Sequence, residues 1–313
     1  MTDSEELRRR LEAKKHERPG EGAGREGEQQ EIRRAVRGMR ERGSERRMRP
    51  LYYRRNLPQH EPTRPAAQAG GKPVALEEAA GGVEVEAPDG SRAWFVAERL
   101  SALGPEFRET GEEFERALTA TGSSLRQRLK AAVGAGDVNV QQIVFLDLET
   151  TGLSNCPVFL IGTMQWAGDE FEVRQYFARN YAEERAILHL YNEAAADKRL
   201  LVTFNGKSFD MPFVRMRAVV NAAPAPPEPA HFDLLHECRR IWGRALPNCR
   251  LQTLESRICG RARTGDIPGA EIPAAYHDYV RTGDAWQMVE VLRHNMLDLV
   301  TMADLMVRFP APE

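Results

Sequence analysis

Cysteine is scarce in this sequence of 313 residues, and no two cysteines form a C-x-x-C pair. The last three lie about ten residues apart, which does not match the usual spacing of zinc ligands. We therefore expect reduced, mostly buried thiols, and neither a disulfide-bonded scaffold nor a zinc site. The cysteines are Cys156, Cys238, Cys249 and Cys259.

Long apolar runs are also missing. No stretch approaches the roughly 20 apolar residues that a helix needs to cross a bilayer. The first residues lack the apolar centre of a secretory signal peptide. These two absences argue against a membrane partner and predict a soluble, cytoplasmic protein.

The net charge is only −2, but the charge is unevenly distributed along the chain. Residues 1–64 contain 18 Lys/Arg and 12 Asp/Glu, whereas the remaining residues contain 26 and 34. Residues 1–72 are poor in large apolar side chains, so burial cannot offset the entropy lost on ordering, and we predict a disordered basic arm. Either this arm contacts nucleic acid, with Tyr52 and Tyr53 stacking on bases among arginines, or it is a solvated tail without a partner.

Residues 73–140 are predicted to form a small lead-in segment. Residues 83–86 alternate between apolar and charged side chains, as a strand does, and a Pro-Asp-Gly turn separates them from a second strand at 92–96. The pattern of 112–133 indicates a helix. The segment is therefore expected to be a hairpin followed by a helix.

Residues 141–309 have the pattern of an α/β domain. An unbroken apolar strand begins at residue 143, and two strands joined by a hairpin turn follow it. A helix, a further strand and several helices come next, which predicts a mixed sheet flanked by helices. The further strands are expected at 159–166, 171–177 and 200–204, and the helices at 183–196, 211–220, 233–242, 251–259 and 286–309.

Two carboxylates, Asp147 and Glu149, stand near the end of the first apolar strand. Because strand side chains alternate, both project from the same face. Adjacent anions repel each other and lose hydration, so a positive charge must compensate them, and a divalent cation with oxygen ligands is the simplest candidate. The alternative is a polar strand end that runs into a Thr-Thr-Gly turn.

Two later positions carry further candidate groups. Asp210 follows a strand and a glycine-containing turn, which places it at the carboxyl edge of the sheet, where ligands of α/β proteins gather. The alternative is that Asp210 caps the following helix. His294 and Asp298 are four residues apart and share one face of the last helix, where the alternative is an ordinary surface pair.

Together these groups match the requirements of two-metal phosphodiester hydrolysis. Two divalent ions about 3.5–4 Å apart need several carboxylates to hold them, which Asp147, Glu149, Asp210 and Asp298 supply. His294 supplies a base that titrates near neutrality. We expect two Mg²⁺ or Mn²⁺ ions as cofactors.

The three motifs resemble those of the DEDD superfamily of 3′–5′ exonucleases, which have a ribonuclease H-like fold. Asp147-x-Glu149-Thr150 is similar to the first motif, and Asn205-x-x-x-Phe209-Asp210 to the second. The third motif departs from the family, because His294-x-x-x-Asp298 places a histidine at the spacing of the tyrosine branch. The wider pattern resembles the YprB-type ribonuclease H-like family over about 141–309. Its elements are His231-Phe232-Asp233, Cys249-Arg250-Leu251, Asp266-Ile267-Pro268-Gly269 and His294-Asn295.

The resemblance implies metal-dependent exonucleolytic hydrolysis of nucleic acid, with a single-stranded 3′ end as the expected substrate. Asp147, Glu149 and Asp298 would ligate one ion, Asp147 would be shared with a second, and Asp210 would complete the cage. His294 would deprotonate or orient the attacking water. Two alternatives stay open: a catalytically degenerate module that binds nucleic acid without cutting it, and a ribonuclease H-like endonuclease.

Substrate contacts are expected from two loops. The main chain after Glu149 would hold the terminal sugar, and Lys207 either meets a phosphate or is a solvated lysine in a polar turn. Asp233 is expected to cap a helix, with a peripheral acid near the metals as the alternative, and His231 and Asp266 are expected to be structural. The residues assigned to substrate binding are Thr150, Thr151, Gly152, Leu153, Asn205 and Lys207.

Overall fold

The computed structural model describes residues 55–56, 73–134 and 136–311. Almost all of the described residues belong to one compact unit. The predicted disordered arm, 1–72, lies outside the described residues apart from Arg55–Asn56. These two form β1, which pairs in parallel with β9 (Arg261–Ala262).

A seven-stranded mixed sheet forms the centre of the fold, with the strand order β2-β3-β6-β5-β4-β7-β8. The first four pairings in this order are antiparallel, and β4 pairs in parallel with β7, which pairs in parallel with β8. The predicted mixed α/β sheet is therefore confirmed. The strands are β2 (Val83–Glu86), β3 (Arg92–Arg99), β4 (Ile143–Thr150), β5 (Val158–Ala167), β6 (Glu170–Phe177), β7 (Leu200–Thr203) and β8 (Ala230–Asp233).

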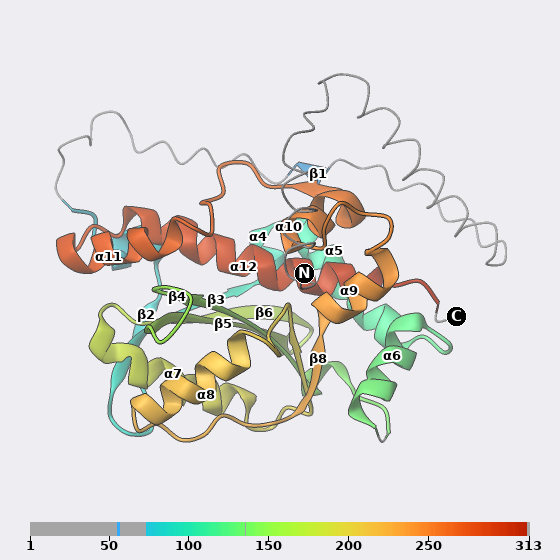
Figure 1. The fold of residues 1–313 in the computed structure, drawn as a ribbon, viewed down its shortest axis with the longest axis horizontal. Helices are drawn as coiled ribbons and strands as arrows, with labels where there is room; N and C mark the ends of the chain where they lie inside the picture. The colour runs from blue at the N-terminus through green and yellow to red at the C-terminus, as the bar shows by residue number, and fades with distance from the viewer. Residues whose placement is uncertain (1–54, 57–72, 135, 312–313) are drawn as a thin grey trace, which may run out of the picture. The chain divides into compact units, whose positions relative to one another are not determined.

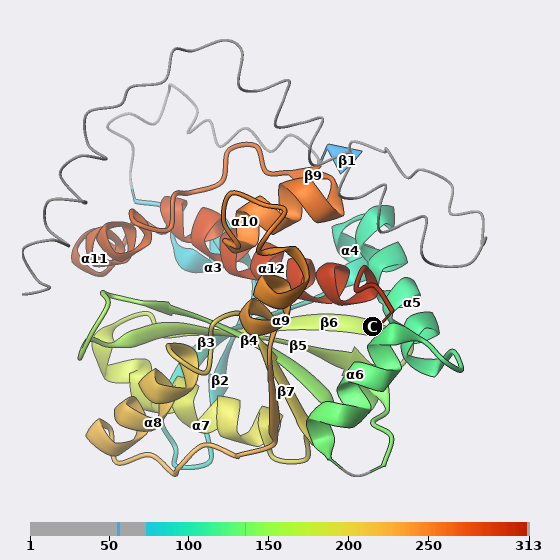
Figure 2. The ribbon, with the colours of Figure 1, turned by 45° about the vertical axis from the view of Figure 1, so that its right-hand side comes forward.

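Helices cover both faces of this sheet (Figures 1 and 2). On one face, α7 (Glu184–Ala195) and α8 (Asp210–Val220) pack against the central strands. On the other face lies α12 (Trp286–Val307), whose long apolar side is buried against β4, β5 and β6. The remaining helices are α3 (Leu76–Ala80), α4 (Leu100–Leu103), α5 (Pro105–Thr119), α6 (Ser124–Val133), α9 (Leu234–Trp242), α10 (Leu251–Leu254) and α11 (Ile272–Thr282), with a π-helical turn at Glu255–Cys259.

The lead-in segment differs from its prediction in two ways. The expected hairpin of β2 and β3 exists, but β3 also pairs with β6, so both strands extend the main sheet. The helix expected at 112–133 is two helices, α5 and α6. Gly122 between them has φ 75°, a conformation that ends a helix, and the Ser123 hydroxyl accepts a hydrogen bond from Arg126 N and caps α6.

Several elements were not predicted from the sequence, among them two in the main domain. The short strand β8 precedes α9, and α11 lies between the π-helical turn and α12. Tyr276 of α11 stacks on Phe159 of β5 with ring centroids 3.9 Å apart, and its hydroxyl donates to Ala178 O at 2.9 Å. This stacking shows that α11 covers the apolar surface of β5.

All four cysteines are free, and Cys238 and Cys259 are buried. In the parts of the chain that the structure describes, no helix has the length and apolar character needed to span a membrane.

Candidate active site

The strand β4 positions Asp147 and Glu149. Both side chains are half-buried and project from one face, because they are two residues apart in a regular strand. The register with β5 shifts between Glu149 and Thr150, so regular pairing stops directly after the second acid. Asp147 lies opposite Gly162 of β5, which has no side chain to cover that face.

Asp210 reaches the same edge of the sheet from the first turn of α8. It is buried, with 5% of its surface exposed, and it is not a helix cap, since Phe209 occupies that position and makes no capping bond. The capping alternative for Asp210 is therefore wrong. Leu148 N lies close enough to the Asp210 carboxylate to stabilise its charged form.

The loop that precedes Asp210 is fixed by a different acid. Asp233 accepts hydrogen bonds from Asn205 N at 2.9 Å and Lys207 N at 3.0 Å, and it also caps α9 by accepting from Leu235 N at 3.0 Å. The expected capping role of Asp233 is confirmed. Asn205 adopts φ 70°, a left-handed conformation that asparagine tolerates better than most residues.

The last helix, α12, brings His294 and Asp298 to the acids of β4. His294 is buried, and its Nε2 lies 3.7 Å from Asp298 Oδ2, one helical turn away. The two groups therefore share one face, and the alternative of an ordinary surface pair is wrong for His294.

The acids from the three elements are close enough to oppose each other's ionisation. Burial and the charges of Asp298, Glu149 and Asp210 raise the pKa of Asp147 well above its usual range. Burial, opposed by the charge of His294, raises the pKa of Glu149 to about 8. Burial likewise raises the pKa of Asp210 to about 7. The protein's own charges do not compensate these carboxylates.

A hydrogen-bonded chain that was not predicted from the sequence orients Asp147. Asn295, fully buried in α12, donates from Nδ2 to Asp147 Oδ2 at 2.8 Å. Gln175 of β6 donates to Asn295 Oδ1 at 2.8 Å and to Leu292 O at 2.7 Å. A Cβ atom at Gly162 would collide with the Asn295 amide, so this glycine makes room for the chain. In the sequence, only the position of Asn295 directly after His294 could have pointed to its role.

Asp266 and Arg263 form a second group at the site. His294 Nδ1 lies 3.0 Å from both carboxylate oxygens of Asp266, which fixes the imidazole from the side opposite Asp298. Arg263 Nη1 lies 3.2 Å from Asp266, Nη2 contacts Asp298, and Nε lies 2.6 Å from Glu255. Asp266 was expected to be structural, and its contact with His294 holds the imidazole in place. Arg263 was not predicted, and only its spacing of three from Asp266 pointed to it.

Asp266 and His294 also shift each other's titration. Burial alone would lower the pKa of His294, but the hydrogen bond to Asp266 and the charges of Asp298 and Glu149 raise it. His294 and Arg263 lower the pKa of Asp266 in spite of its burial. His294 therefore keeps its proton to higher pH than a free histidine when nothing else neutralises the acids.

The chemistry of these donors fits a hard divalent cation. All four candidate ligands are carboxylates, the type that Mg²⁺ and Mn²⁺ prefer. Burial and mutual repulsion raise the pKa values of Asp147, Glu149 and Asp210. Within the described ranges, however, no three Asp, Glu, His or Cys side chains already stand as ligands of one ion. Arg263 binds Asp298, so this acid would have to adjust to hold a cation, whereas Asn295 occupies only one oxygen of Asp147.

The predicted substrate residues lie in two loops beside the acids. Thr150 is buried and donates to Gly152 O at 2.6 Å, and Thr151 N donates to Pro157 O at 3.0 Å, which shapes the first loop. Leu153 at its tip is 87% exposed. Asn205 and Lys207 are exposed in the second loop. His231, expected to be structural, binds Thr203 Oγ1 at 2.8 Å, and burial lowers its pKa to about 4.

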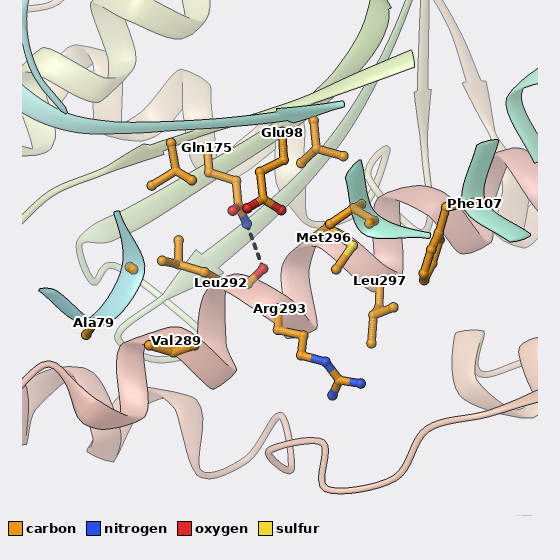
Figure 3. A pocket seen from close by; sticks show the side chains of 13 residues that line it. Ala79, Glu98, Phe107, Gln175, Val289, Leu292, Arg293, Met296 and Leu297 are labelled. Carbon is orange, nitrogen blue, oxygen red and sulfur yellow. Dashed lines mark hydrogen bonds between the residues drawn. The ribbon is translucent and has the colours of Figure 1, made fainter. Parts of the chain in front are cut away.

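A cavity of about 390 Å³ lies on the α12 side of the sheet, away from these acids (Figure 3). Its walls are mostly apolar and include Phe107, Met296 and Leu297, and the polar side chains of Glu98 and Gln175 point into it from the strands. The bond from Gln175 to Leu292 O, drawn in Figure 3, belongs to the chain that orients Asp147. None of the four candidate ligands lines this cavity.

Comparison with known proteins assigns this arrangement to a family. A model of the RNase H superfamily matches residues 144–309, which include every predicted site residue. The chain belongs to the RNase H superfamily. This RNase H-like chain is also 31% identical over 200 residues to the "Uncharacterized protein YprB" of Bacillus subtilis (strain 168). That match covers 62% of the chain, which spans about half (48%) of the length of this curated relative.

Two solved structures resemble parts of this RNase H-like chain at low sequence identity. The family B DNA polymerase from the hyperthermophilic archaeon Pyrobaculum calidifontis is 16% identical, with a TM-score of 0.43, over 55% of this chain and 25% of the polymerase. E. coli exonuclease I in complex with a dA16 oligonucleotide is 15% identical, with a TM-score of 0.27, over 50% of this chain and 45% of the exonuclease.

Proposed function

We propose that this protein is a metal-dependent nuclease that hydrolyses nucleic-acid phosphodiester bonds and removes nucleotides from a 3′ end. The observation that carries the proposal is the convergence of Asp147, Glu149, Asp210 and Asp298 from three separate elements. The first three have raised pKa values that the protein's own charges do not offset. Membership of the RNase H superfamily supports the assignment to nucleic-acid hydrolysis.

Each acid has a defined role in this proposal. Asp147, Glu149 and Asp298 would hold one divalent ion, Asp147 would be shared with a second, and Asp210 would complete the set. Bound Mg²⁺ or Mn²⁺ would supply an activated water and charge stabilisation of the leaving oxygen. Asn295 fixes the Asp147 carboxylate so that one of its oxygens remains directed away from the amide.

His294 would accept the proton of the attacking water or orient that water. Its neighbours suit this role, because Asp266 at Nδ1 leaves Nε2 facing Asp298 and the other acids. The charge of the acids raises the pKa of His294, so neutralising that charge would return the imidazole to its basic form near neutral pH.

The proposed polarity of cleavage assigns substrate contacts to the two loops beside the acids. The main chain of Thr150 to Leu153 would hold the terminal sugar, and Asn205 and Lys207 would contact the adjoining nucleotide. A single-stranded end fits this assignment, because a free terminus must reach acids that lie at a sheet edge. The basic residues 1–72 would add contacts to nucleic acid.

A panel of end-labelled oligonucleotides, single- and double-stranded, DNA and RNA, tests the proposal. We expect degradation that requires Mg²⁺ or Mn²⁺, stops with chelator, and yields single-nucleotide steps from the 3′ end. A blocked 3′ end should abolish the reaction. Cleavage that continues on blocked substrates would indicate an endonuclease, and no cleavage with either ion would contradict the proposal.

A second candidate function is binding without cleavage. The contact between Arg263 and Asp298 favours it, because a fixed guanidinium supplies part of the positive charge that a metal ion would bring. Calorimetric titration of the protein with Mn²⁺ separates the two functions. A nuclease should bind the ion, and the binding should disappear in Asp147→Asn, whereas a degenerate module should bind nucleic acid equally well with and without the ion.

A further inference from the structure

A group of exposed basic side chains begins beside the catalytic acids and continues along α9. We call Lys207, His236, Arg239 and Arg250 the α9 basic face; all four are exposed. The stretch 236–263 contains seven arginines and only two glutamates, although the whole chain has a net charge of −2. The basic character is therefore a local feature and does not reflect the overall composition.

Contacts with shared neighbours link these four residues. Asp233 accepts from Lys207 N, and its Oδ2 lies 3.9 Å from His236 Nε2. Arg239 follows His236 by three residues and lies on the same face of α9. Arg239 also lies near Cys249, which directly precedes Arg250 in the chain. Burial raises the pKa of the Cys249 thiol, and the charge of Arg239 opposes this effect.

The charges on this face are not used within the protein. In the described part of the chain, Lys207, Arg239 and Arg250 have no carboxylate partner, whereas the nearby Arg240 pairs with Glu237 at 2.5 Å. An unpaired, solvated arginine gains from contact with a phosphate without first breaking an internal ion pair.

The helix that presents these side chains is firmly anchored. The opposite side of α9 is buried through Leu234, Leu235, Cys238 and Trp242. Trp242 packs on Phe309 with ring centroids 5.7 Å apart, and Glu237 pairs with Arg128 of α6 at 3.0 Å. The basic face is therefore held in a fixed position relative to the acids, and binding would order little beyond the side chains themselves.

We propose that the α9 basic face binds the phosphate backbone of the single strand whose 3′ end lies at the catalytic acids. The inference rests on the proposed function and adds the path of the nucleotides that precede the scissile bond. Lys207 is three residues from Asp210, and His236 and Arg239 lie further along on α9, so a short substrate would contact only the beginning of the face. Affinity should therefore rise with oligonucleotide length.

Binding measurements test the path independently of cleavage. Fluorescence anisotropy in chelator compares Arg239→Ser/Arg250→Ser with the wild type on a single strand of about 16 nucleotides. The matched control is Arg108→Ser/Arg116→Ser, which removes two exposed arginines from α5. We expect the α9 variant to bind about tenfold more weakly, with a slope of log K against log salt that is smaller by about 1.4, while the control binds like the wild type.

Kinetics on two substrate lengths complete the test. The α9 variant should raise KM for the long strand, leave kcat unchanged, and cleave a trinucleotide like the wild type. Unchanged affinity for the long strand, or an equal loss in the α5 control, would overturn the inference. If the wild type shows no metal-dependent cleavage, the proposed function fails, but the anisotropy result still decides whether this face binds nucleic acid.

Discussion

Buried acids occur in two parts of this protein, and their surroundings differ. Glu184 of α7 is buried and receives four hydrogen bonds, from Val158 N, Arg217 Nε, Arg217 Nη2 and Asn221 Nδ2, at 2.6–2.9 Å. Asp147 receives bonds from a single neutral amide, and it faces three other carboxylates. The first acid is neutralised by the protein itself, whereas the second is not, and its pKa is raised well above the usual range.

This difference separates a structural acid from a functional one. A buried charge is tolerated when a partner and hydrogen bonds replace its hydration, which is the situation of Glu184 with Arg217. A group of uncompensated carboxylates lowers the stability of the folded state. Such groups occur mostly at functional sites. Substitutions of Glu184 and of the acids around Asp147 should therefore have different effects on stability and on activity.

Replacing Asp147 should have the largest effect. Asp147→Asn keeps the acceptor for Asn295 but removes a proposed ligand charge, so we expect the rate of oligonucleotide cleavage to fall by about 10³-fold or more. Stability should not fall, because repulsion among the acids is relieved. Cleavage assays and urea denaturation check both outcomes, and undiminished cleavage would rule out the assignment of Asp147.

Replacing Glu184 should have the opposite pattern. Glu184→Gln leaves Arg217 buried without its full partner, so we expect the free energy of unfolding to fall by about 3 kcal/mol, with the metal-dependent rate of the folded protein kept. The control Glu228→Gln breaks the exposed pair with Arg215 and should cost less than about 1 kcal/mol. Urea denaturation measures both, and equal costs would contradict the contrast.

Removing the carboxylate that holds His294 should have an intermediate effect on activity. The charge of Asp266 orients the His294 imidazole and raises its pKa, and Asp266→Asn removes that charge. We therefore expect kcat to fall by about 10- to 100-fold. The acidic limb of the pH–rate profile should also move to lower pH. Asp278→Asn, at an exposed pair on α11, is the control, and a loss of rate with an unmoved limb would argue against the link to His294.

The last effect concerns the pH dependence of stability without metal. The pKa of Glu149 is raised to about 8 from 4.5, and that of Asp210 to about 7 from 3.8. Because the folded state binds these protons more tightly, their stabilising contribution is present below about pH 4 and is lost as the pH rises toward 8. The free energy of unfolding in chelator should therefore decline over that range, by at most about 1.4 kcal/mol per pH unit for each group.

Two comparisons sharpen this last experiment. Mg²⁺ should flatten the decline, because a bound cation replaces the protons, and Asp147→Asn should reduce it. Urea denaturation across the pH range, with and without the ion, provides the measurement. Stability that rises from pH 4 to 8 in chelator would show that the acids are compensated by groups within the protein.

Local patterns predicted most of the core. The apolar runs of β4 and β5, the turn at Gly168 and the long helix α12 each follow from short-range periodicity and turn chemistry. Elements with weak local signals were not predicted. The strand β8 has four residues, and only its pairing with β7 defines it as a strand. The hairpin of β2 and β3 was expected, but its attachment to β6 depends on long-range pairing that spacing does not report.

The sequence by itself determined that Asp147 and Glu149 share a strand face and that His294 and Asp298 share a helix face, because both follow from the fixed periods of a strand and a helix. Only the tertiary structure decided which acids remain uncompensated. Asp233 and Asp210 have the same side chain and both lie at helix starts, yet one caps a helix and the other faces the acids of β4. Asn295, Asp266 and Arg263 gain their roles through contacts between distant segments, and charge compensation depends on distance in space, which the order of residues does not specify.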